Sequence, residues 1–137
     1  GNFLIGRIIG LPGEKIMIKN YGVWINGSII QQSKLREGDL SDSFQRPSNA
    51  KAFKDEMDKL AVTNYKFTRE SVAEKPGFYL ISHSTGQPTA AAEMPETEIA
   101  PEKYFILNDN REATDTDSRN FGPIHRYASR GVVFLTI

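Results

Sequence analysis

The stretch RIIGLPGEKIMIKNYGVWING, residues 7–27, decides the fold class of this chain. Its apolar and β-branched residues come in short runs, which are separated by the turn formers Gly, Pro and Asn. Lys15–Lys19 alternates polar and apolar side chains, a pattern typical of a half-buried strand. The pair Asn26-Gly27 favours a two-residue type I′ hairpin turn, because both central residues of that turn need a positive φ. This stretch therefore predicts an antiparallel β-meander.

The same pattern of turns and short strands runs through this stretch and beyond it. Gly10–Glu14 and Asn20–Gly22 are rich in turn formers and predict turns between strands. Six further segments are short, apolar and rich in β-branched or aromatic residues, which predicts strands. They are Phe3–Ile9, Val23–Ile25, Ser28–Ile30, Phe78–Ser82, Tyr104–Leu107 and Gly131–Ile137.

The middle of the chain has a different pattern. Gln31–Ser48 is polar and predicts a loop, and Gly86–Pro101 contains three prolines, which predicts an irregular connection. Ser48 is expected to cap a helix over Asn49–Ala61, because the apolar residues of that segment fall on one helical face. We therefore expect one domain over residues 1–137 with a mostly β, antiparallel fold and a mixed helical and loop insertion.

Composition excludes several classes of function. Seventeen basic residues balance seventeen acidic ones, which argues against a general nucleic-acid binder and gives no support for a polybasic membrane patch. The chain has no cysteine, so disulfides and thiolate chemistry are excluded. No apolar run approaches the roughly 20 residues that a membrane-spanning helix needs. The chain opens at Gly1-Asn2-Phe3, already within a strand pattern, and we expect that further residues precede it.

Two segments carry a resemblance to a known family. The first is Arg7–Glu14 with the hairpin that ends at Asn26-Gly27. The second is Tyr104–Glu112, continuing through Asp117–Pro123. In this order they resemble bacterial type I signal peptidases, the serine peptidase family S26, and Gly131-Val132-Val133-Phe134 resembles that family's final strand. The resemblance implies a signal-peptidase-like fold with a family core over residues 1–30 and 102–137 and a variable insertion over 31–101.

The resemblance also implies which residues support the site. Arg7 is expected beside the loop after Leu107, although about a hundred residues separate them in the sequence. Thr114 is similar in place to the family's serine that bonds the catalytic lysine. From the residues alone, bracing of a long loop is the alternative, because Asp and Asn satisfy turn backbones and Arg clamps carboxylates. The predicted site-supporting residues are Arg7, Asp109, Arg111, Thr114, Asp117, Ser118 and Arg119.

The family's catalytic dyad is missing from this chain. Signal peptidases use a serine nucleophile and a buried, neutral lysine that removes its proton. In the resemblance the lysine immediately precedes Arg7, but Gly6 stands there. The serine is expected some tens of residues before Gly10, beyond the start of the chain. We therefore expect no catalytic residue and no peptidase activity.

Other residues do not replace the dyad. Lys15 and Lys19 alternate with apolar residues, so they are expected to face solvent. Ser82–Thr89 resembles the family's serine box, but it has one residue too many and the wrong place in the chain order, so a polar turn after a strand is favoured. His83 and His125 are the only histidines and lack metal-ligand spacing. We expect no metal and no cofactor.

Three hypotheses about function stay open. The first is a signal-peptidase-like protein without catalysis that binds extended segments of secreted or pilus-type proteins by strand addition, as an assembly factor. The second is part of an active signal peptidase, and the third is an unrelated binding module on this fold. The resemblance places the chain on the extracytoplasmic face of a bacterial membrane, with an anchor upstream. An exposed strand edge at Phe3–Ile9 would also favour pairing with a second copy of the chain.

Overall fold

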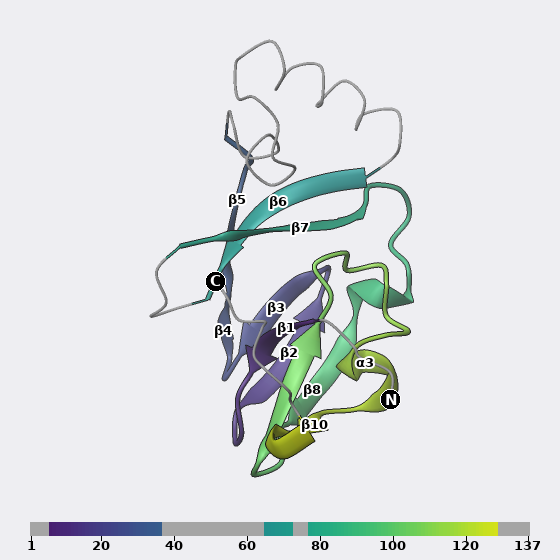
Figure 1. Cartoon of the computed structure of the whole chain (residues 1–137). Helices are drawn as coiled ribbons and strands as arrows, with labels where there is room; N and C mark the ends of the chain where they lie inside the picture. The colour runs from purple at the N-terminus through teal and green to yellow at the C-terminus, as the bar shows by residue number, and fades with distance from the viewer. Residues whose placement is uncertain (1–5, 37–64, 73–76, 129–137) are drawn as a thin grey trace.

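The described residues of the computed structural model form three antiparallel sheets, and Figure 1 shows how their strands are arranged. The structure describes residues 6–36, 65–72 and 77–128. The strand orders are β1-β9-β10, β4-β3-β2-β8 and β5-β6-β7. The predicted mostly β, antiparallel fold is thus confirmed. The strands are β1 Arg7–Gly10, β2 Lys15–Lys19, β3 Gly22–Ile25, β4 Ser28–Ile29, β5 Gln31–Ser33, β6 Tyr65–Ser71, β7 Tyr79–Ser84, β8 Met94–Glu98, β9 Lys103–Leu107 and β10 Ile124–His125.

The β-meander predicted from residues 7–27 is present. β2 pairs with β3 from Ile16 opposite Ile25 to Lys19 opposite Gly22. Asn26 and Gly27 have φ values of 50° and 82°, which confirms the type I′ turn between β3 and β4. On β2 the apolar Ile16 is buried while both lysines are exposed, as the alternating pattern predicts.

The first strand pairs with a partner that is distant in sequence. β1 lies antiparallel to β9, with Arg7 opposite Leu107 and Ile8 opposite Ile106. The register shifts between Ile8 and Gly10. The β1–β9 pairing therefore places the family-like segment that begins at Arg7 beside the one that begins at Tyr104.

Two segments that were predicted as irregular form strands, and two further strands, β6 and β10, were not predicted. Gln31–Ser33 is β5 instead of the start of a loop, and Met94–Glu98 is β8 within the supposed connection. β5 and β8 are the end strands of their sheets. An edge strand tolerates polar residues and a proline, because one of its sides needs no ladder hydrogen bonds. β6, which pairs with both β5 and β7, had no prediction.

Other predictions shift or fall outside the described residues. The strand expected over Phe78–Ser82 is β7, Tyr79–Ser84, so the polar stretch from Ser82 begins within a strand rather than in a turn. The start of the Phe3–Ile9 strand, the helix over Asn49–Ala61 and the strand over Gly131–Ile137 lie outside the described residues. The described part of the chain has only short helices: η1 Ala90–Ala92, α3 Ser118–Phe121 and η2 Arg126–Ala128.

One apolar core joins the three sheets. Ile9 of β1, Ile16 of β2 and Ile81 of β7 belong to a single cluster of buried side chains. Burial of this cluster is the main force that holds the sheets together. Its other buried members are Ile18, Val23, Ile30, Tyr79, Ile99, Phe105 and Leu107. Among the described residues, no helix is long and apolar enough to cross a membrane.

Candidate functional site

Arg7 and Asp109 form a two-pronged ion pair at the end of the β1–β9 ladder. Arg7 Nε donates to Asp109 Oδ1 and Arg7 Nη2 donates to Asp109 Oδ2, both at 2.9 Å. The guanidinium also lies over the Tyr79 ring, 4.0 Å from its centroid. Burial alone would lower the pKa of Arg7, but the hydrogen bonds and charge of Asp109 raise it above its usual value. Arg7 is therefore a permanent cation that fixes the start of the loop after β9.

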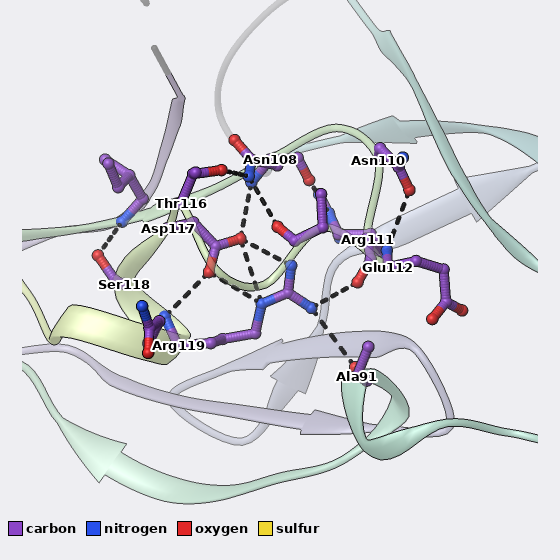
Figure 2. Close-up of polar contacts among 12 residues, drawn as sticks. Ala91, Asn108, Asn110, Arg111, Glu112, Thr116, Asp117, Ser118 and Arg119 are labelled. Atoms are coloured by element: carbon purple, nitrogen blue, oxygen red, sulfur yellow. Dashed lines mark hydrogen bonds and ion pairs between the residues drawn. The ribbon is translucent and has the colours of Figure 1, made fainter. Parts of the chain in front are cut away.

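A buried carboxylate organises the same loop further along (Figure 2). Asp117 is fully buried and caps helix α3, accepting from the Arg119 main-chain N–H at 3.0 Å. It also accepts from Arg119 Nη2 at 2.7 Å and from the Asn108 main-chain N–H at 3.0 Å. Beside it, Ser118 Oγ accepts from the Ile106 N–H at 2.9 Å. Asp117 and Ser118 together tie the end of the loop to β9.

Arg111 connects this loop to β6 through a buried ion pair. Arg111 Nη2 lies 2.6 Å from Glu70 Oε1, and both side chains are at most 2% exposed. Tyr79 Oη donates to Glu70 Oε1 at 2.7 Å, and Gln32 Nε2 donates to Glu70 Oε2 at 3.0 Å. Burial alone would raise the pKa of Glu70, but the charge and hydrogen bonds of Arg111, with those of Tyr79 and Gln32, lower it. The carboxylate is therefore ionised and neutralised in place.

Glu112 joins three further parts of the chain. Its carboxylate accepts hydrogen bonds from Tyr21 Oη, from Thr89 Oγ1 at 2.6 Å and from the Ser84 N–H at 3.0 Å. The His83 ring stacks on the Tyr21 ring, with centroids 4.2 Å apart. Burial would raise the pKa of Glu112, but these hydrogen bonds lower it. The segment that resembles the serine box is thus held against the loop.

Main-chain bonds complete this contact. The Ser82 N–H donates to the Asp109 carbonyl at 2.9 Å, and the Arg111 N–H donates to the Ser82 carbonyl at 2.7 Å. They form a parallel bridge between Ser82 and Asn110. The Ser82–Thr89 segment therefore braces the loop, although the sequence indicated only a polar turn.

Comparisons with known proteins now bear on this arrangement. A family model described as signal peptidase, peptidase S26, matches residues 1–137. The chain belongs to the S26 signal peptidase family. Among curated proteins, none matches the chain. Among solved structures, the chain is similar to the crystal structure of a signal peptidase I from Enterococcus faecalis V583, with 23% sequence identity and a TM-score of 0.42. That alignment covers 93% of this chain and 80% of the other.

The position that resembles the family's lysine lies against an apolar side chain. A Cβ built on Gly6 would lie 3.3 Å from Ile106 Cδ1 and 3.4 Å from Ile106 Cβ. Ile106 is itself buried in β9. Residue 6 therefore offers no amine, and the first atom of any side chain there would press against the core.

The structure brings the predicted supporting residues into one network. Arg7 contacts Asp109, and Arg119 Nη1 donates to the Arg111 carbonyl at 2.8 Å. The prediction that Arg7 lies beside the distant loop is thus confirmed. Thr114 lies within this loop, where its N–H donates to the Glu112 carbonyl at 3.1 Å. Its suggested match to the family's lysine-binding serine stays a prediction.

The sequence did not reveal several partners in this network. Glu70, Tyr21 and Thr89 contact the loop residues and Gln32 contacts Glu70, yet none of the four was singled out as a site residue. Thr68 and Glu70 alternate on the buried face of β6, where period-2 reasoning would expect apolar side chains. A polar alternation of this kind indicates a solvent face, so it gave no signal of a buried ion pair.

Proposed function

We propose that this S26 family member lacks peptidase activity and binds extended segments of secreted or pilus-type proteins at the extracytoplasmic face of a membrane. One observation carries the proposal: Gly6 stands where the resemblance puts the family's lysine and lies against Ile106, while Arg7 is paired with Asp109 and Arg119 with Asp117 in the loop after β9. The absence of the catalytic lysine, together with the presence of the ion pairs that hold the loop, favours a binding role over catalysis.

The chemistry of the family requires the base that Gly6 lacks. The serine hydroxyl is a weak nucleophile until a neighbouring neutral amine accepts its proton. Lys15 and Lys19 are exposed on β2, which pairs with β3 and β8 and not with β1. Neither lysine lies in the sequence position that resembles the base. A serine in a longer chain would therefore still lack the usual proton acceptor.

Binding does not require the dyad. An extended segment that adds to a sheet edge is held by main-chain hydrogen bonds, and side-chain pockets supply its specificity. The ion pairs of Arg7 and Arg119 fix the loop beside β1 and β9, so the surface is kept rigid without catalysis. A protein of this kind would act on its clients as an assembly factor.

A cleavage and binding assay tests the proposal. The protein is incubated with a synthetic signal-peptide substrate, with an active signal peptidase as positive control, and the products are followed by mass spectrometry. We expect the substrate to stay intact and extended peptides to bind in a fluorescence titration. Cleavage after a small-x-small sequence would overturn the proposal and favour an active peptidase. Neither cleavage nor binding would favour the unrelated binding module.

A further inference from the structure

Asn26 and Gly27 form the tip of the β3–β4 hairpin and carry a chemistry that the proposed function does not use. An asparagine followed by glycine cyclises readily, because glycine has no side chain to hinder attack by its main-chain nitrogen. No other asparagine of the chain is followed by glycine. Asn26 is exposed, and a Cβ built on Gly27 would have no neighbour within 4 Å among the described residues, apart from its own chain neighbours. Water therefore reaches this pair.

The reaction is a spontaneous deamidation that needs only water. The Gly27 main-chain nitrogen attacks the Asn26 Cγ and loses its proton, while the bond from Cγ to Nδ2 breaks and ammonia leaves. The product is a five-membered succinimide ring. Water then opens the ring at one of its two carbonyl carbons. One opening gives aspartate, and the other gives isoaspartate, in which the main chain runs through the side-chain carbon.

The folded turn holds the reacting atoms apart. Asn26 and Gly27 have φ values of 50° and 82°, and the first central residue of a type I′ turn has a ψ of about +30°. At that ψ the Gly27 nitrogen lies nearly opposite the Asn26 Cβ across the Cα–C bond, whereas ring closure needs both on the same side. The Cα–C bond must rotate by roughly 150° from its type I′ value, which takes Gly27 out of the turn.

Hydrogen bonds to β2 hold Asn26 in this conformation. The Asn26 N–H donates to the Lys15 carbonyl at 2.8 Å, and Asn26 Oδ1 accepts from the Lys15 N–H at 2.9 Å. Ring closure turns the Asn26 side chain toward Gly27, so the bond to Oδ1 must break. Cyclisation is therefore blocked while the tip of the hairpin is closed.

The strand that closes the tip is short. β4 pairs with β3 at two positions, and both of its residues are exposed. Just beyond β4, the N–H of the buried Ile30 donates to the Val23 carbonyl at 2.8 Å. A short exposed edge with few buried contacts opens at a lower free energy than the core. The tip can therefore open while Ile30 stays in place.

We infer that Asn26 is a latent deamidation site, which reacts only when the tip of the β3–β4 hairpin opens. Aspartate leaves the main chain unchanged, but isoaspartate lengthens it by one carbon, and the register of a hairpin depends on the length of its loop. The type I′ turn cannot re-form around isoaspartate, so an opening becomes permanent. The deamidated fraction thus records how often the tip has opened.

Peptide mapping by mass spectrometry tests the inference. Folded protein and protein unfolded in urea are incubated at the same mildly alkaline pH, and isoaspartate is detected by enzymatic methylation. We expect Asn26 to deamidate at least about tenfold more slowly in the folded protein, because only its open fraction reacts. Asn20 and Asn108 are internal controls that should react slowly even in urea, since larger residues follow them. Equal rates at Asn26 in both samples, or no reaction there in urea, would overturn the inference.

Ile29→Gly separates opening of the tip from the chemistry. The variant loses the side chain that pairs with Trp24 across the strands, so folded Ile29→Gly should deamidate roughly threefold faster or more, with an unchanged rate in urea. Leu11→Gly is the matched control, because Leu11 is 42% exposed and lies outside the hairpin. Circular dichroism shows that both variants are folded. An unchanged rate in folded Ile29→Gly, or an equal acceleration in Leu11→Gly, would show that β4 does not gate the reaction.

Discussion

Arg111 and Glu70 form a buried ion pair, with Nη2 2.6 Å from Oε1, across 41 residues of sequence. Arg111 belongs to the loop after β9, whereas Glu70 lies in β6, within the middle stretch that was expected to be a variable insertion. The β6 strand therefore braces this loop from inside the protein. Changes in that stretch are expected to reach the site through this pair.

Removal of the Glu70 charge should destabilise the fold. Glu70→Gln leaves the Arg111 guanidinium buried without a counter-charge, which typically costs about 3–5 kcal/mol. We expect a loss of this order in the free energy of unfolding, measured by urea denaturation at pH 7. Glu102→Gln is the control, because the Arg126–Glu102 pair is 45% and 48% exposed and should matter little. Equal losses in the two variants would contradict the assignment.

Stability should fall in acid, and Glu70 should contribute to that fall. The folded pKa of Glu70 lies below the ordinary value of 4.5, so the unfolded chain binds more protons as the pH drops. The stabilisation is complete well above 4.5 and is lost as the pH falls through the lower folded pKa. Urea titrations from pH 7 to pH 3 should show wild-type stability converging on that of Glu70→Gln. If the stabilities of wild type and Glu70→Gln fell in parallel as the pH dropped, Glu70 would not contribute to the loss of stability in acid.

The local sequence pattern was sufficient to predict only part of the fold. The meander around Asn26-Gly27 was predictable, because alternation and turn chemistry act between close neighbours. β5 and β8 were not, since they are edge strands whose polar residues and Pro95 resemble those of a loop. Their strand character comes from pairing with β6 and β2, which is a tertiary effect.

The sequence predicted only those site residues that lie in the segments resembling the family. That resemblance identified Arg7 and Asp109 as neighbours and singled out Asp117 and Arg119. Glu70 and Tyr21 were missed, because their partners in the loop lie 41 and 91 residues away in sequence. Nothing in the residues near either one indicates such a partner.

The Tyr21 hydroxyl should stabilise the hairpin that carries it. Tyr21 has a φ of 65°, which is unfavourable for an aromatic residue, and its hydroxyl donates to the Glu112 carboxylate. Tyr21→Phe removes that bond and should cost about 1.5–3 kcal/mol, the usual range for a hydrogen bond to a charged group. Urea denaturation measures the loss. Tyr127→Phe, at a residue 71% exposed, is the control; a similar loss there would show that the Glu112 contact is unimportant.

Alanine substitutions at Gly6 and Gly10 test whether side-chain packing requires glycine at position 6. In Gly10→Ala the new Cβ would lie 2.3 Å from Ile99 Cδ1 and 3.0 Å from Phe105 Cβ, so we expect a loss of about 1–3 kcal/mol from overpacking. In Gly6→Ala the approach to Ile106 is 3.3 Å, and the loss should be clearly smaller in the same urea denaturation. Packing against Ile106 would then not require glycine at position 6. An equal loss at both positions would mean instead that packing holds Gly6 in place.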